Sequence, residues 1–111
     1  MGVRAVVAAG LVLLGAAGCS GAGGPPGGDP ETTGVVRTRD GGAFLVESSD
    51  GYFEGMSLLG GDPLIYRGSD GAEIGAVGLE EGATVEVWIG GPCAESYPVQ
   101  CDIEAVRVLD R

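Results

Sequence analysis

Histidine and lysine are both absent from this 111-residue chain, and its six basic residues face 16 aspartates and glutamates. Without histidine there is no imidazole metal ligand and no histidine general base. Without lysine there is no Schiff-base lysine and no P-loop lysine. The net charge of −10 argues against nucleic acid as a partner, because phosphate binding depends on Lys and Arg.

Long hydrophobic runs are also scarce, and the longest lies near the start of the chain. Residues 5–17 contain only apolar residues and glycine. As a helix, this run would span roughly 20 Å, which is too short for about 30 Å of hydrocarbon. Its length instead suits the apolar part of a signal peptide.

The end of this run, Ala16-Ala17-Gly18-Cys19, resembles the lipobox of bacterial lipoproteins. The resemblance implies a lipoprotein signal peptide over residues 1–18, cleaved to leave a diacylglyceryl and palmitate group on Cys19. The protein would then be anchored to the cell membrane at its extracytoplasmic face. The alternative is an ordinary secretory signal in which Cys19 is incidental.

Residues 19–33 are predicted to form a flexible linker behind the lipidated cysteine. Eight of the 14 residues from 20 to 33 are Gly or Pro, and none is a large apolar residue. Such a segment buries too little surface to offset its ordering entropy. One folded domain is expected at residues 34–111.

Short β-rich runs separated by Gly and Pro favour an all-β domain. A tight turn is expected at Asp40-Gly41-Gly42. A helical turn is expected within residues 52–60, and residues 72–77 are a weak candidate for a sixth strand. The five expected strands span residues 35–38, 43–48, 64–67, 83–89 and 99–109.

Alternation predicts which side chains face the core. Val85, Val87 and Ile89 share one face of their strand, and Trp88 lies on the other. In the last strand, Cys101, Ile103 and Ala105 share one parity, and the apolar positions then change parity, which predicts a β-bulge or a corner. Val85, Val87, Ile89 and Ile103 are expected to be buried. A small five-stranded OB-like barrel fits best, with a small β-sandwich as the alternative.

The cysteines divide into one lipidation candidate and one pair. With Cys19 assigned to lipid, Cys93 and Cys101 flank the last connection and are expected to form a disulfide in an oxidising compartment. A redox dithiol is the less favoured alternative, because C-x7-C is not a C-x-x-C spacing and no Lys or His lies nearby to lower a thiol pKa.

Acidic loops are frequent, with Asp-Gly or Gly-Asp pairs at residues 40, 50, 61 and 70. They suit either calcium or ordinary turns, and the turn interpretation is favoured because no EF-hand spacing is present. A carboxylate pair of the glycosidase type is disfavoured, because a single Trp offers few sugar platforms. No cofactor, no metal site and no enzymatic activity are therefore expected.

The polar loop after residue 94 stands out as a candidate binding site. It either shapes the hairpin or presents Tyr97, held by Pro98, as a rigid anchor for a partner. Because the chain is acidic, a cationic protein partner or envelope component is favoured. The candidate partner-binding residues are Trp88, Glu95, Ser96, Tyr97, Pro98 and Gln100.

Two sequence elements resemble the YobA-like family of small bacterial lipoproteins. These are Val85-Glu86-Val87-Trp88 and Glu95-Ser96-Tyr97-Pro98-Val99-Gln100. The resemblance implies a lipid-anchored, OB-like domain of unassigned activity, and the Cys93 and Cys101 pair departs from it as an added crosslink. The expected function is a non-catalytic binding module on the outer face of the membrane. The alternatives are an envelope spacer without a ligand and, less favoured, a carboxylate-based enzyme.

Overall fold

The computed structural model describes residues 25–109, so the predicted signal peptide and Cys19 lie outside the described residues. Within this range the fold is all-β, as predicted, with two short 3-10 turns. No helix in residues 25–109 has the length and apolar character needed to cross a membrane. The elements are β1 (Thr32–Arg39), β2 (Gly42–Val46), η2 (Gly51–Phe53), β3 (Leu64–Arg67), η3 (Ala76–Gly78), β4 (Thr84–Ala94) and β5 (Gln100–Val108).

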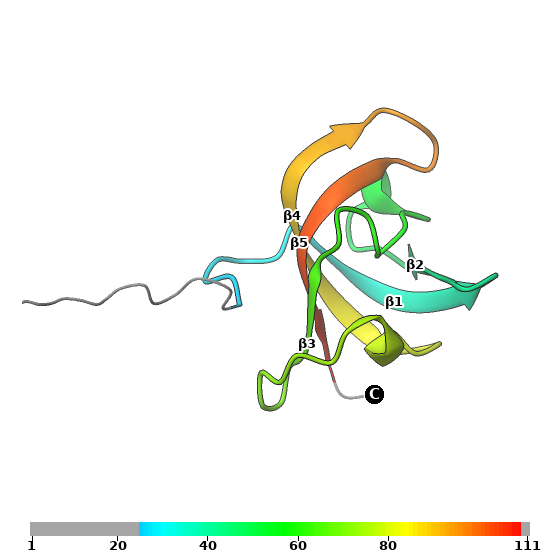
Figure 1. The fold of residues 1–111 in the computed structure, drawn as a ribbon. Coiled ribbons are helices and arrows are strands. Elements are labelled where there is room, and N and C mark those ends of the chain that lie inside the picture. The colour runs from blue at the N-terminus through cyan, green and yellow to red at the C-terminus, as the bar shows by residue number, and fades with distance from the viewer. Residues whose placement is uncertain (1–24, 110–111) are drawn as a thin grey trace, which may run out of the picture.

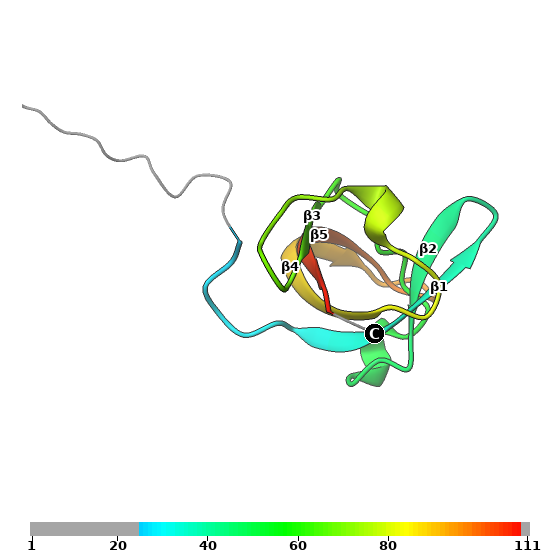
Figure 2. The same cartoon turned by 90° about the horizontal axis from the view of Figure 1, so that it is seen from below.

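The five strands form one mixed sheet in the order β2-β1-β4-β5-β3. Neighbouring strands are antiparallel except β3 and β5, which are parallel. The sheet curls into a half-barrel, and the long β4–β5 hairpin bends away from it at one end (Figures 1 and 2). The strong curvature lets one small sheet enclose its own core.

The gap between the edge strands β2 and β3 is crossed by the connection between them. The amide of Leu45 in β2 donates to the carbonyl of Met56 at 2.8 Å, and the amide of Ile103 in β5 donates to the carbonyl of Gly60 at 3.0 Å. Residues 55–60 therefore run from β2 to β5. They satisfy backbone groups that an open sheet edge would leave unpaired.

The barrel core confirms the predicted alternation in β4. Val85 and Val87 are fully buried, Ile103 is buried, and Ile89 packs against the same cluster while half-buried. Trp88 lies on the opposite face of the sheet, in a second, smaller cluster. The other core members are Val36, Ala43, Leu45, Phe53, Met56, Leu58, Ile65, Leu79, Ala83, Val99, Cys101 and Val106.

The predicted change of phase in β5 is a β-bulge at Glu104. Trp88 pairs with Ala105 and Ile89 pairs with Ile103, so Glu104 is an extra residue on β5. The bulge allows Ile103 before it, and Val106 and Val108 after it, to face the same core. Ala105, grouped with Ile103 by parity, instead belongs to the outer cluster with Trp88.

Strand β4 ends five residues later than predicted, at Ala94, because its glycines are part of the strand. A Cβ at Gly90 would lie 2.8 Å from the Cβ of Glu104, and a Cβ at Gly91 would lie 3.0 Å from the Cβ of Asp102. The two strands approach too closely there for larger residues. Glycine, expected to end the strand, is what allows it to continue to Ala94.

Three smaller expectations have different outcomes. The Asp40-Gly41 turn is present, and both residues have positive φ, 51° and 81°, as a two-residue hairpin turn requires. A 3-10 turn at Gly51–Phe53 overlaps the expected helical turn. The expected sixth strand at residues 72–77 is wrong, because only one bridge, between Glu73 and Tyr66, forms there before η3 begins.

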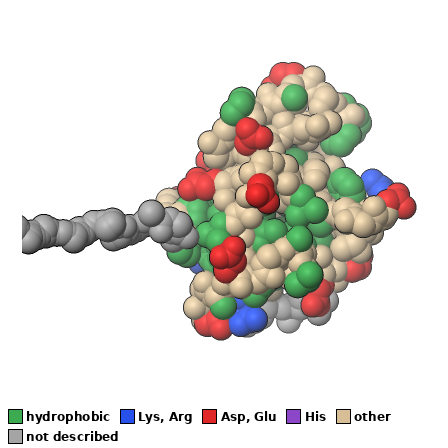
Figure 3. Space-filling view, in the orientation of Figure 1, with side chains coloured by type: hydrophobic (Ala, Val, Ile, Leu, Met, Phe, Trp, Pro, Cys, Tyr) green, Lys and Arg blue, Asp and Glu red, His purple; other side chains and the backbone are tan. Residues whose placement is uncertain are grey.

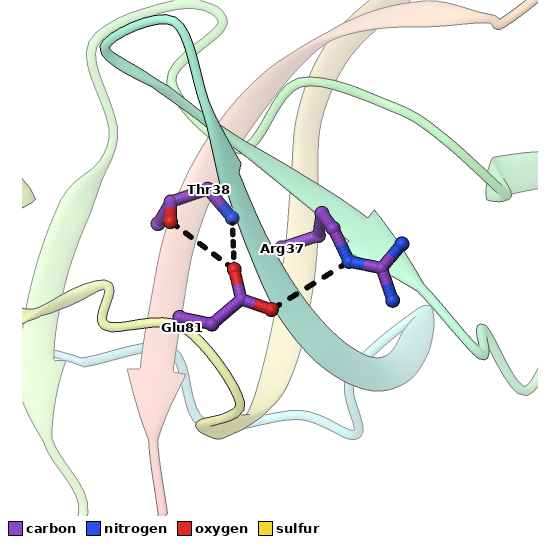
Figure 4. Close-up of polar contacts among 3 residues, drawn as sticks. All are labelled: Arg37, Thr38 and Glu81. Carbon is purple, nitrogen blue, oxygen red and sulfur yellow. Dashed lines mark hydrogen bonds and ion pairs between the residues drawn. The ribbon is translucent and has the colours of Figure 1, made fainter.

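The first strand starts at Thr32, two residues before the predicted start of the domain. Thr32 is buried, and its hydroxyl lies 2.7 Å from the hydroxyl of Ser48. Further along the strand, β1 no longer pairs with β4, and the side chain of Glu81 binds it instead. The carboxylate of Glu81 accepts a hydrogen bond from the amide of Thr38 at 2.7 Å and forms an ion pair with Arg37 (Figure 4). The Thr38 amide, its hydroxyl and Arg37 together lower the pKa of Glu81.

Candidate binding site at the hairpin tip

The predicted disulfide between Cys93 and Cys101 is present and joins β4 to β5. The two cysteines face each other directly, one register step before Ala94 and Gln100. Beyond that pair, residues 95–99 form the end of the hairpin. The crosslink therefore fixes the base from which the predicted binding loop projects.

Tyr97 is the most exposed large hydrophobic residue of residues 25–109, with 99% of its surface open. Its peptide bond to Pro98 is cis. The hydroxyl of Ser96 donates to the carbonyl of Pro98 at 2.9 Å, and the amide of Ser96 donates to the carbonyl of Ala94 at 2.8 Å. Val99 is buried in the barrel core. The backbone around Tyr97 is thus held on both sides while its ring stays in solvent.

A contact that the sequence did not predict ties the hairpin end to η2. The hydroxyl of Tyr52 donates to the carboxylate of Glu95 at 2.6 Å. The ring of Tyr52 packs edge-on against Phe53, with ring centres 4.9 Å apart, and Phe53 is buried in the core. The hydrogen bond to Glu95 is the main reason that the pKa of Tyr52 is raised. Tyr52 remains 47% exposed beside the loop.

These residues define one surface, which we call the tip surface. Pro98 lies close to Gly55: a Cβ added to Gly55 would be only 3.3 Å from the Cβ of Pro98. The hairpin end and the η2 turn therefore contact each other. The tip surface comprises Tyr52, Glu95, Ser96, Tyr97 and Pro98.

Two predicted binding residues lie apart from the ring of Tyr97. Trp88 pairs with Ala105, far back along the hairpin, on the outer face of the sheet. Its indole nitrogen donates to the carbonyl of Gly28 at 2.9 Å, and the side chain is buried. Gln100 is exposed at the base of the hairpin end, opposite Ala94. The structure thus separates Trp88 from the tip surface.

Two of the acidic loops, at Asp50 and Asp70, use their carboxylates within turns. Asp50 accepts a hydrogen bond from the amide of Tyr52 at 3.0 Å and caps η2. Asp70 accepts from the amide of Ala72 at 3.0 Å and from Arg67 at 2.8 Å, and both contacts lower its pKa. In the described part of the chain, no group of three or more Cys, Asp or Glu residues is arranged to hold a metal ion.

A surface hollow of about 540 Å³ lies away from the tip surface. Val77, which is 86% exposed, stands at this hollow. None of its lining residues belongs to the tip surface. They are Arg67, Ile74, Val77, Gly78, Glu80, Ala83, Val108 and Leu109.

No family model, curated protein or solved structure matches this chain in the comparisons. The resemblance to the YobA-like family therefore stays a prediction that rests on its two sequence elements. Of the site, sequence reasoning missed Tyr52. The only sequence feature that pointed to Tyr52 was its place inside the helical turn expected at residues 52–60.

Proposed function

We propose that this protein is a lipid-anchored, extracytoplasmic binding module that contacts its partner through the tip surface and catalyses no reaction. One observation carries the proposal: Tyr97 is 99% exposed although the backbone on either side of it is tied down. A large ring costs little entropy to immobilise when its backbone is already fixed. Tyrosine is also among the residues that dominate binding energy at interfaces.

The charge of the chain favours a cationic partner. The chain carries 16 acidic against six basic residues. Figure 3 shows acidic side chains spread over one face of the domain, with basic ones at its margins. A field of one sign speeds encounter with an oppositely charged partner but does not supply specificity. In this proposal, Tyr97 and Tyr52 supply the specific contacts.

The anchor and the finer fold assignment are part of the same proposal. Cys19 would carry the lipid, and the domain would be an OB-like barrel of the YobA-like type. The four strand pairings support an OB-like arrangement, with residues 55–60 filling the place where β2 and β3 would meet. Mass spectrometry of the mature protein tests the anchor: a diacylglyceryl group on Cys19 is expected. An unmodified Cys19 contradicts it.

The binding role is tested by placing a photo-crosslinking phenylalanine derivative, which keeps an aromatic ring, at position 97 of the full-length protein in its native membrane. The matched control carries the same amino acid at position 77, because Val77 is also highly exposed but lies at the separate hollow. A discrete adduct with one basic protein is expected from position 97 and not from position 77. The adduct should weaken at high salt, because screening reduces the long-range attraction.

Substitutions separate a binding role from a structural one. Tyr97→Ala and Glu95→Ala should remove the adduct formed from a crosslinker at position 100, while the melting temperature stays within a few degrees. Val77→Ala should leave that adduct unchanged. Identical adducts from positions 97 and 77, or capture that survives both tip substitutions, would refute the tip surface as the binding site.

A further inference from the structure

The outer face of the sheet carries an aromatic cluster separate from the barrel core. Trp88, Tyr66 and Ala105 are buried there, and Leu64 packs against them. The rings of Tyr66 and Trp88 lie 6.5 Å apart and are inclined by 32°. The guanidinium of Arg107 lies 5.7 Å from the centre of the Trp88 ring and pairs with Glu86. We call Leu64, Tyr66, Trp88 and Ala105 the outer cluster.

A segment that the sequence assigns to the linker lies against this cluster. The carbonyl of Gly28 accepts the hydrogen bond from the indole nitrogen of Trp88 at 2.9 Å. Pro26 lines a hollow of about 500 Å³ together with Leu64 and Ala105. This segment, residues 25–28, reads Pro-Pro-Gly-Gly and is called the strap below. Figure 1 shows it at the side of the curled sheet, near the middle of β4, before the chain enters β1.

The chain just after the strap is fixed more firmly than the strap itself. The amide of Glu31 donates to the carbonyl of Val87 at 2.9 Å, and the carboxylate of Glu31 accepts from the amide of Ile89 at 2.8 Å. In contrast, Gly28 is exposed apart from its carbonyl contact, and Pro26 is only half-buried. The strap therefore has few contacts, and one of them is a hydrogen bond to its backbone.

We propose that the outer cluster is a binding site for proline- and glycine-rich peptide segments, occupied by the strap in cis and able to take the same type of segment in trans. Two contacts carry the recognition: the indole N–H donates to a backbone carbonyl of the segment, and a proline lies at the apolar edge formed by Leu64 and Ala105. The segment carries no charge of its own, so the acidic domain does not repel it.

Because the strap is joined to β1, its effective concentration at the outer cluster determines how tightly it must bind to stay docked. A short flexible connection gives an effective concentration on the order of millimolar. The strap stays docked only if the dissociation constant of an equivalent free segment is below that value. A free segment should therefore compete at millimolar concentrations, and a substitution that weakens the strap should make the site open to it.

The chain contains one Trp, so the fluorescence of Trp88 reports directly on the cover. In the full-length protein, Pro26→Gly should increase acrylamide quenching of Trp88 several-fold and shift its emission to longer wavelength. Pro25→Gly is the matched control, because Pro25 is exposed and the same substitution one residue earlier changes chain entropy in the same way. Gly28→Ala is a second control, because a Cβ there would meet nothing within 4 Å.

The second arm adds a synthetic peptide of residues 21–31 to the Pro26→Gly protein. Quenching should return toward the wild-type value at millimolar peptide, and a peptide with Gly in place of Pro26 should have at least a several-fold weaker effect. Equal quenching of Pro26→Gly and Pro25→Gly would overturn the role of the strap. Absence of protection at roughly 10 mM peptide, well above the effective concentration, would overturn the binding site.

Discussion

Two aromatic side chains of the same hairpin have opposite surroundings. Tyr97 lies at the hairpin end and exposes 99% of its surface, whereas Trp88 lies near the base and exposes 6%. Both belong to short sequence motifs that together predict one binding site. The difference shows that the surroundings of each ring decide its role. At the tip surface, the backbone is fixed and the ring of Tyr97 is free. In the outer cluster, the ring of Trp88 is buried and contacts a loosely held segment.

The largest expected difference between the two regions is in stability. Trp88→Ala should lower the free energy of unfolding by about 3 kcal/mol, because it empties a buried site of its largest side chain. Tyr97→Ala should change it by less than about 0.5 kcal/mol, as is usual for an exposed residue. Urea unfolding followed by circular dichroism measures both. Similar losses for the two variants would mean that Tyr97 packs against the domain.

Much of the fold could be predicted from local pattern. The bounds of β3, the Asp40-Gly41 turn and the inward face of β4 each depend on short-range signals that alternation and turn chemistry carry. The length of β4 could not be predicted in this way. Its Gly90 and Gly91 read as strand breakers, and only the close approach of β5 explains why they are needed.

The sites were harder to predict, because contacts between distant residues create them. Tyr52 and Glu95 are 43 residues apart in sequence, and Trp88 and Gly28 are 60 apart. No local period links such pairs. The prediction that Trp88 neighbours the hairpin end overlooked how far the longer β4 carries that end beyond Trp88.

The next largest effect should come from the crosslink, which lies much closer to the tip surface than to the outer cluster. Replacing Cys93 and Cys101 with Ala should cost about 2.6 kcal/mol, from the chain-entropy model for a nine-residue loop. The melting temperature should fall by roughly 10–20 °C. Acrylamide quenching of Trp88 should stay at the wild-type value below the transition. Increased quenching in the folded variant would show that the two regions are coupled.

A smaller effect should separate Arg107 from an ordinary surface arginine. Arg107 pairs with Glu86 beside the Trp88 ring, whereas Arg67 pairs with Asp70 in an exposed turn. Arg107→Gln should cost up to about 1 kcal/mol, less at high salt, and should alter Trp88 emission. Arg67→Gln is the matched control and should leave the emission unchanged. If both variants alter it equally, the Arg107 contact with the ring is not specific.

The smallest effect is a titration at the tip surface. The hydrogen bond from the hydroxyl of Tyr52 to Glu95 favours the neutral phenol, so the pKa of Tyr52 is raised above its usual value of about 10. A raised pKa stabilises the folded state below the unfolded value, and this contribution is lost as the pH rises through the folded pKa. Alkali should therefore detach Tyr52 from Glu95 before the buried core responds.

Phenolate absorbance during an alkaline titration measures this directly in a chain with three tyrosines. Glu95→Gln should lower the pKa of Tyr52, because it removes both the charged acceptor and its repulsion of the phenolate. Tyr52→Phe assigns the transition by deleting it. The pKa of Tyr66 is raised mainly by burial in the outer cluster, so that transition should not move in Glu95→Gln. A shift of both transitions together would show that the tip surface and the outer cluster respond as one unit, contrary to the separation argued from their contacts.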